Sequence, residues 1–214
     1  MSDDLFREVD EEVRQDQYLR LWKQYGIYIA GVVVTIILIT VGVVVWRDMQ
    51  RSELEANGEE MLGAIAVMEE RPDEALDQLA ALGNEGTKGY RLLARLREAA
   101  LLSERGDARS AVALYDSVAA DSGHEQMYRD LAKLLSVSHG MSVMDRSEVK
   151  DRLAPLVGDN NAWRYSAREL VATAEMSSGD MAAARESFQA LVDDVGAPSG
   201  VRARAAEMLA ILAP

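Results

Sequence analysis

The 214-residue sequence contains no cysteine, and it has only two histidines, two phenylalanines and four prolines. Without cysteine the chain cannot form structural disulfides, thiolate zinc sites or thiol nucleophiles. His124 and His139 lie far apart and do not have the spacing of a metal site. Strand-like alternation of apolar and polar residues is also absent, whereas helical periodicity covers most of residues 53–212. The sequence therefore predicts an all-α protein, and we expect neither a metal nor a cofactor.

Basic residues are scarce relative to acidic ones. The chain has 23 lysines and arginines against 36 aspartates and glutamates, a formal net charge of -13, and most of the acidic excess follows residue 51. An acidic domain repels the phosphate backbone, so nucleic acid is not an expected partner. The acidic domain also offers no basic patch for anionic lipid headgroups.

Signatures of catalysis are missing as well. The sequence has no glycine-rich phosphate loop, no HExxH and no GxSxG motif. Its paired acids are adjacent residues, which point about 100° apart on a helix and cannot face one reacting bond: Glu59-Glu60, Glu69-Glu70 and Asp193-Asp194. We therefore interpret these acids as solvated surface charges and do not expect an enzyme.

The chain does contain one long apolar run. Residues 27–46 read IYIAGVVVTIILITVGVVVW and carry no charge. As a helix rising about 1.5 Å per residue, they would cross the roughly 30 Å core of a bilayer. The run is too long, and starts too late, for a cleaved signal peptide, and no small-x-small site follows Trp46. Aromatic residues flank it as at membrane interfaces: Tyr18, Trp22, Tyr25 and Tyr28 on one side and Trp46 on the other. We predict a transmembrane helix over residues 26–47.

The distribution of basic residues predicts the orientation of this helix. Four basic residues precede the span (Arg7, Arg14, Arg20, Lys23), and two follow it within the same distance (Arg47, Arg51). The positive-inside rule then places residues 1–25 in the cytoplasm as a short tail. The large domain would lie outside, in the periplasm of a Gram-negative bacterium.

The tail itself has a narrow apolar stripe. Leu5, Val9 and Val13 recur every four residues, with Phe6 beside them, in an otherwise acidic segment. Two interpretations remain open. The tail is either a docking helix for a cytoplasmic partner or a solvated helical lead-in to the span.

Residues 52–214 show a repeating helical pattern. In the helix predicted over Tyr90–Arg105, one apolar face would contain Leu92, Leu93, Leu96, Ala99, Ala100 and Leu102. A Gly106-Asp107 turn follows, and the next helix has Ala111, Tyr115 and Val118 on one face. The same pattern recurs around Gly179-Asp180, followed by Ala184, Phe188 and Leu191. The two turns are 73 positions apart (106 to 179), about twice a 36-residue repeat.

This spacing leaves room for two further, weaker hairpins. Helices over Met127–Val137 and Ser147–Val157, joined by a looser turn around His139-Gly140, fit the middle position. Upstream, a first hairpin would use Leu62-Gly63 with Ala75, Leu79 and Leu82, and a last helix over Gly200–Leu212 would cap the stack. The pattern resembles tetratricopeptide repeats. We predict an α-solenoid of about four hairpins with a C-terminal capping helix.

In such solenoids the first helices of the hairpins line a concave groove. The candidate groove residues, chosen by their position on those helices, are Glu104, Arg129, Lys133, Glu169 and Thr173. The alternative is that these five side chains are ordinary exposed surface.

Three segments carry a resemblance to a known family. They read REVDEEVRQDQ at Arg7–Gln17, LWKQYG at Leu21–Gly26 and AWRYSARELVATAEMSSGD at Ala162–Asp180. With the order of tail, span and degenerate repeats, they resemble the YfgM-like family, ancillary subunits of the SecYEG translocon, and in particular its alphaproteobacterial branch. Where that family often has proline before the tryptophan, this chain has Ala162.

The resemblance implies a bacterial inner-membrane protein whose repeat domain lies in the periplasm. Its implied partners are the SecYEG translocon and a periplasmic chaperone, and its implied role is to help newly exported proteins. We therefore expect a non-catalytic, membrane-anchored scaffold. Two alternatives remain open: a cell-envelope assembly or division factor, and a regulatory membrane protein whose tail, Ser2–Gln17, binds a cytoplasmic regulator.

Overall fold

The computed structural model describes the backbone of residues 2–212 and the side chains of residues 23–212. Throughout this part of the chain, helices are joined by short connections and no strand occurs. The chain divides into two compact units, Met1–Glu55 and Ala56–Pro214. The predicted all-α class is confirmed.

Helix α1, Ser2–Val67, contains the apolar run. An 18-residue window of α1 has a mean hydropathy of 2.8, and none of that window is buried inside the protein. Because the core helix of a soluble domain would be buried, the segment is a candidate membrane span. The hydroxyls of Thr35 and Thr40 donate to carbonyls four residues back, at 2.8 Å, so both polar groups are satisfied within the helix. The stripe predicted at Leu5, Val9 and Val13 lies outside the residues whose side chains are described.

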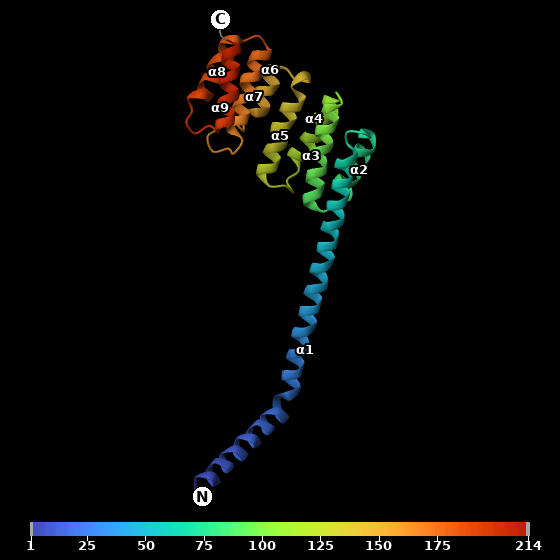
Figure 1. Cartoon of the computed structure of the whole chain (residues 1–214), viewed down its shortest axis with the longest axis vertical. Coiled ribbons are helices and arrows are strands. Elements are labelled where there is room, and N and C mark those ends of the chain that lie inside the picture. Colours follow the sequence, from blue (N-terminus) through green and yellow to red (C-terminus); the bar gives the residue numbers. More distant parts are fainter. Residues whose placement is uncertain (1, 213–214) are drawn as a thin grey trace. The chain divides into compact units, whose positions relative to one another are not determined.

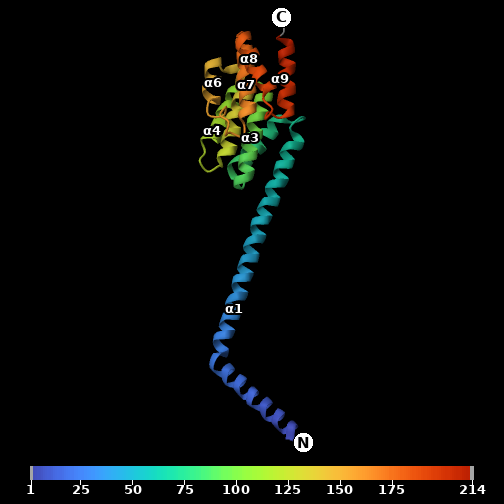
Figure 2. The same ribbon diagram turned by 90° about the vertical axis from the view of Figure 1, so that its left-hand side faces the viewer.

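The second unit is a stack of helical hairpins (Figures 1 and 2). The C-terminal part of α1 pairs with α2 (Pro72–Glu85), and α3 (Lys88–Glu104) pairs with α4 (Ala108–Ala120). Next come α5 (Gln126–Gly140) with α6 (Arg146–Leu153), then α7 (Arg164–Ser177) with α8 (Met181–Asp193). The short 3-10 helix η1 (Met141–Val143) links α5 to α6, and α9 (Ser199–Ile211) packs on α7 and α8. In the described part of the chain, four hairpins and a capping helix are thus as predicted.

The two Gly-Asp turns have one geometry. Gly106 and Gly179 adopt positive φ angles of 88° and 85°, which L-residues with side chains avoid. The N–H of the aspartate that follows donates to the carbonyl five residues back, and the glycine N–H donates three back, as in a Schellman motif. Asp107 and Asp180 then cap the next helix, each accepting at 3.1 Å from the N–H three residues on. The dipeptide therefore ends one helix and begins another.

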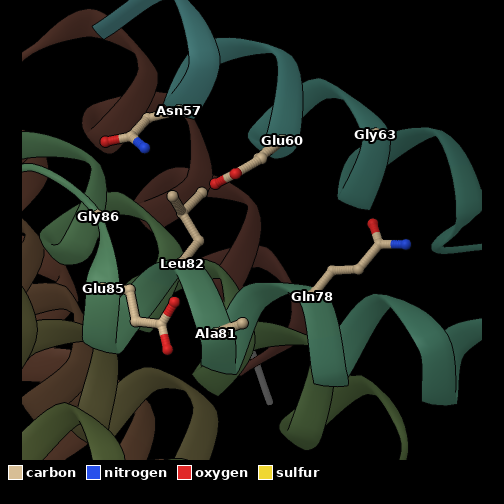
Figure 3. Close-up of a pocket in the computed structure, with 8 residues that line it drawn as sticks. All are labelled: Asn57, Glu60, Gly63, Gln78, Ala81, Leu82, Glu85 and Gly86. Carbon is tan, nitrogen blue, oxygen red and sulfur yellow. The ribbon is translucent and has the colours of Figure 1, made fainter. Parts of the chain in front are cut away.

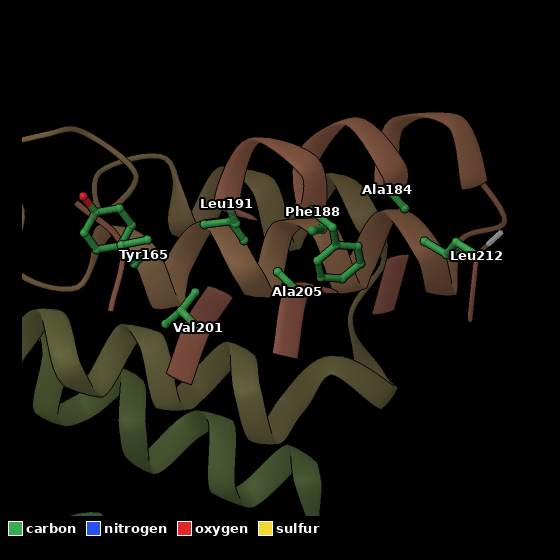
Figure 4. Packing of buried hydrophobic residues seen from close by; sticks show 9 residues of the cluster. Tyr165, Ala184, Phe188, Leu191, Val201, Ala205 and Leu212 are labelled. Atoms are coloured by element: carbon green, nitrogen blue, oxygen red, sulfur yellow. The ribbon is translucent and has the colours of Figure 1, made fainter. Parts of the chain in front are cut away.

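The second and fourth hairpins, which share the Gly-Asp turn, also share a pattern of buried residues on their second helices. Tyr115 on α4 and Phe188 on α8 are fully buried, and each is preceded four residues earlier by a fully buried alanine. Figure 4 shows Phe188 among residues of α7, α8 and α9, with Ala184 and Leu191 on its own helix and Ala205 on α9. The predicted equivalence of the two second helices is confirmed.

The predicted apolar face of α3 was wrong in part. Leu93 is 51% exposed, whereas Ala94 and Leu101, which the single-face pattern left out, are buried. In a stack, α3 is covered by the hairpin before it as well as by the one after it, so its buried residues occupy two sides. A single apolar stripe describes a helix with one covered side.

The register predicted for the first helix of the first hairpin was also wrong, whereas the residues predicted for its second helix, Ala75, Leu79 and Leu82, are buried as expected. Leu62 is 68% exposed, and a Cβ on Gly63 would meet only a side-chain oxygen at 3.8 Å. Ala64 and Met68 are the buried residues instead. The buried Ala64 lies 11 residues before the buried Ala75, whereas Ala99 lies 12 residues before Ala111, so the buried face of the first helix is displaced by one residue from the 36-residue repeat. Helix α1 approaches α3 most tightly at Gly58 rather than at Gly63, because a Cβ on Gly58 would lie 2.9 Å from the Tyr90 hydroxyl.

The third hairpin has a short second helix. Helix α6 ends at Leu153, two residues before Pro155, whereas the sequence pattern predicted a helix to Val157. At its other end, Gly140 closes α5 against α4, because a Cβ there would lie 2.3 Å from Cγ2 of Val112. The predicted loose turn at His139-Gly140 is thus the end of a helix packed tightly at its glycine.

We expect Gly140→Ala to lower the free energy of unfolding by about 1–3 kcal/mol, because the added methyl group overpacks the α4–α5 contact. The measurement is urea unfolding of the detergent-solubilised chain, followed by circular dichroism. Gly158→Ala is the matched control, since a Cβ at Gly158 meets nothing within 4 Å. Equal effects of the two substitutions would contradict a steric role for Gly140.

Candidate protein-binding surface

Exposed apolar residues gather on the first helices of the first two hairpins. Leu62 and Ile65 on α1 are 68% and 41% exposed, and Leu93 on α3 is 51% exposed. On α3, Leu93, Arg97 and Glu104 share one exposed stripe, at i, i+4 and i+11. Because Gly58 of α1 meets Tyr90 of α3, residues one turn further along, such as Leu62 and Leu93, lie at one level of the two helices. We call Leu62, Ile65, Leu93, Arg97 and Glu104 the first-helix surface.

Of the five groove residues predicted from the sequence, Glu104 belongs to this surface. It lies at the end of α3 near a buried polar pair, in which the Tyr115 hydroxyl is 2.8 Å from Nδ1 of His139. Burial raises the pKa of Tyr115 to about 12, and the charge of Glu104 adds to that rise. Burial lowers the pKa of His139, against the opposing effect of Glu104. The hydrogen bond between the Tyr115 hydroxyl and Nδ1 of His139 joins α4 to α5.

Glu169 and Thr173 lie together on α7 but are engaged within the chain. Two guanidinium nitrogens of Arg204 on α9, Nε and Nη2, donate to the Glu169 carboxylate, at 2.6 and 2.7 Å. The hydrogen bond and charge of Glu169 raise the pKa of Arg204. The Thr173 hydroxyl donates to the Glu169 carbonyl at 2.9 Å. The Glu169 charge is thus neutralised by the capping helix.

Arg129 and Lys133 lie on α5, and both are half-buried between helices. Nε of Arg129 donates to the Ala119 carbonyl at the end of α4, at 3.0 Å. Nζ of Lys133 lies 3.4 Å from the Asp130 carboxylate. Lys133 also lines a shallow pocket together with Asp116 and Arg152, which belong to second helices. The five predicted residues therefore do not converge on one site.

Sequence reasoning missed the apolar half of the first-helix surface because it assigned Leu93 to the core. The adjacent pair Leu92-Leu93 indicated that one of the two leucines lies outside the core face, since adjacent residues on a helix cannot both face one neighbour. Leu92 is buried and Leu93 is exposed.

Arginines join successive hairpins in a repeated way. Nε of Arg95 on α3, of Arg129 on α5 and of Arg168 on α7 each donates at 3.0 Å to a carbonyl at or just after the end of the preceding second helix. The acceptors are Gly83, Ala119 and Val157. A cation at a helix C-terminus satisfies otherwise unpaired carbonyls and opposes the helix dipole.

We expect Arg95→Met to lower the free energy of unfolding by about 1–2 kcal/mol, because the Gly83 carbonyl loses a charged donor while the apolar stem is kept. Thermal unfolding of the purified full chain measures the change. Arg97→Met, two residues along α3 at an exposed position, is expected to change stability by less than about 0.5 kcal/mol. If Arg97→Met is as costly as Arg95→Met, the carbonyl contact is not the cause.

Helix α6 is held by two buried apolar side chains and by ion pairs on two sides. Val149 and Leu153 are the only buried residues of this helix. On one side, Nζ of Lys150 lies 2.7 Å from the buried carboxylate of Glu175 on α7. On the other side, Arg152 lies 2.8 Å from Asp116 of α4. These ion pairs make α6 an electrostatic joint between the second and fourth hairpins.

Stacked antiparallel hairpins, joined by short turns and bearing an exposed apolar and charged face, define a helical-repeat protein of the protein-binding class. The chain matches the family model of the tetratricopeptide repeat-like domain over residues 20–140, more than half of its length, and it belongs to that family. The matched region includes the candidate span and the helices up to α5. Domains of this kind are generally non-catalytic protein-binding modules. No curated protein and no solved structure matches the chain.

Proposed function

We propose that this protein is a membrane-anchored scaffold whose first-helix surface binds other proteins. One observation supports it above the others: a single chain joins an exposed apolar span to a tetratricopeptide repeat-like domain. A tether of this kind raises the effective concentration of the domain near a membrane complex, so weak contacts suffice. The surface offers Leu62, Ile65 and Leu93 as apolar contacts and Arg97 and Glu104 as charged ones.

The more specific proposal is an ancillary subunit of the SecYEG translocon that recruits periplasmic chaperones to exported proteins. The resemblance of Arg7–Gln17, Leu21–Gly26 and Ala162–Asp180 to the YfgM-like family supports it. The excess of basic residues before the span supports a cytoplasmic N-terminus and a periplasmic repeat domain in a bacterial inner membrane. In this proposal Glu104 belongs to the binding surface, Glu169 with Thr173 beside it contributes to the contact between α7 and α9, and Arg129 and Lys133 contribute to the joints between hairpins.

The test is site-specific photo-crosslinking in living cells. A photoreactive residue at Leu93 or Glu104 is expected to capture translocon subunits, periplasmic chaperones or exported chains. Position 151 on α6, which is exposed on a second helix, is the control and is expected to capture fewer of them. Position 169 is avoided, because its substitution would break the pair with Arg204. Capture of cytoplasmic proteins alone would overturn both the orientation and the export role.

Deletion of the tail separates this proposal from a regulatory function. An export scaffold is expected to keep its crosslinks at Leu93 and Glu104 when residues 2–17 are removed. A membrane regulator that works through its tail would lose its effect instead.

A further inference from the structure

An open groove lies between α2 and the C-terminal part of α1 (Figure 3). It encloses about 420 Å³, and its lining includes Asn57, Glu60, Gly63, Gln78, Ala81 and Glu85. Glycine and alanine leave room between the helices, since a Cβ on Gly63 would approach only the Gln78 side chain. No residue of α3 lines the groove, and Leu82, which does, also belongs to the buried cluster that α2 shares with α1 and α3.

In the later hairpins, the chain itself occupies the corresponding position. On two of the later first helices, Arg95 and Arg168 each stand four residues before a fully buried alanine, namely Ala99 and Ala172. Both arginines donate to a carbonyl of the preceding hairpin: Arg95 to Gly83 in the last turn of α2, and Arg168 to Val157, four residues after the end of α6. On α1 the equivalent residue is Glu60, four residues before the buried Ala64. No described helix packs against α1 at that position.

The sign of the charge is therefore reversed at the open end of the stack. Glu60 and Glu85 are exposed, and no lysine or arginine lines the groove. A carboxylate at this position repels the carbonyl end of a helix such as α2 or α4, which the internal arginines bind. It attracts lysine or arginine side chains instead. The groove therefore suits a helix that presents basic side chains, unlike the carbonyl ends of α2 and α4 that the arginines of the stack bind.

We propose that this groove binds a basic amphipathic helix of a partner protein, whose small apolar face lies over Gly63 and Ala81 while its lysines or arginines pair with Glu60 and Glu85. This surface is separate from the first-helix surface, so the proposal does not depend on the export function. Binding would be weak and would fall with added salt, because both carboxylates are exposed.

Three synthetic helical peptides test the proposal. They share one apolar stripe of alanine and leucine, and their flanking positions carry lysine, glutamine or glutamate. Binding to the full chain in a neutral detergent is measured by fluorescence anisotropy. The lysine peptide is expected to bind about tenfold more tightly than the glutamine peptide, and the glutamate peptide is expected not to bind.

Paired variants locate the binding. Glu60→Lys with Glu85→Lys is expected to weaken binding of the lysine peptide about tenfold or more. Glu59→Lys with Asp77→Lys makes the same change in net charge on the same two helices, at exposed positions outside the groove lining, and is expected to keep near-wild-type affinity. Ala81→Trp fills the groove without changing charge and is expected to block binding. Circular dichroism confirms that each variant is folded.

Equal weakening by both charge pairs would show diffuse attraction to an acidic domain and overturn the proposal. Undiminished binding to the Ala81→Trp variant would overturn it as well. Sedimentation identifies the remaining occupant: self-association that Ala81→Trp abolishes, without binding of the lysine peptide, would assign the groove to a second copy of this chain. The photo-crosslinks at Leu93 and Glu104 are read separately, so failure here leaves the scaffold proposal standing.

Discussion

Phe188→Ala is expected to lower the free energy of unfolding by about 3–5 kcal/mol. The Phe188 ring is fully buried in the cluster that joins α7, α8 and α9, and its removal leaves a cavity lined by residues of all three helices. Because repeat proteins are stabilised largely by contacts between neighbours, the loss is expected to fall on the fourth hairpin and its cap. Urea unfolding of the detergent-solubilised chain measures the total, and hydrogen exchange shows where protection is lost.

Two substitutions provide the comparison. Phe188→Leu keeps most of the apolar volume and is expected to cost much less than alanine. Val195→Ala, at a residue that is 92% exposed in the same region, is expected to change stability by less than about 0.5 kcal/mol. If α7–α9 keep their protection in the Phe188→Ala protein while α1–α4 lose theirs, nearest-neighbour stacking does not describe this domain.

Glu175→Gln is expected to have the second-largest effect, a loss of about 2 kcal/mol at neutral pH. The Glu175 carboxylate is 4% exposed and accepts hydrogen bonds from Lys150 at 2.7 Å and from Ser187 at 2.6 Å, with Arg146 at 3.6 Å. Removing one partner of a buried pair costs about 3–5 kcal/mol when both charges are buried. The lysine and arginine are 40% and 31% exposed, so water recovers part of that loss.

The stabilisation by the Glu175 ion pair is expected to decrease as the pH falls. Burial alone would raise the pKa of Glu175, but the hydrogen bonds from Lys150 and Ser187 and the charges of Lys150 and Arg146 outweigh it and hold the pKa below its ordinary value of 4.5. The ionised pair therefore stabilises the fold fully above pH 4.5, and its contribution is lost as the pH falls through the lower pKa of the folded state.

Urea unfolding of the wild type and of Glu175→Gln, at a series of pH values between neutral and about pH 3, tests this dependence. The difference in stability between the two proteins is expected to be constant at neutral pH and to shrink in acid. Asp151→Asn, on the exposed side of α6, is the control and is expected to show no such difference. A gap that persists unchanged in acid would mean that the carboxylate charge does not stabilise the α6 joint.

The strong hairpins were predictable because their signals are local. A glycine in the left-handed conformation followed by a capping aspartate specifies where one helix ends and the next begins, whatever surrounds it. The first and third hairpins lack this pair. There the structure departed from the repeat pattern: Ala64 is buried in place of Leu62-Gly63, and α6 ends at Leu153, two residues before Pro155.

The candidate site was predictable only in outline. Position along the first helices selected Glu104, which is exposed, as a groove residue, but it could not show that Arg129 reaches the end of α4 or that Glu169 meets Arg204. These partners lie 10 and 35 residues away in the chain, and the angle between hairpins decides whether a long side chain reaches them.

The sequence by itself determined the apolar span, the helical class, the hairpin repeat and the turns at Gly106 and Gly179, because each follows from composition, periodicity or backbone conformation within a few residues. Tertiary structure alone decided which sides of the first helices α1 and α3 are covered. It placed Leu93 on the surface and Glu175 in the interior, and it left Glu60 facing an open groove. The physical reason is that burial in a stack depends on two neighbouring hairpins at once, and contacts between hairpins join residues that no local pattern relates.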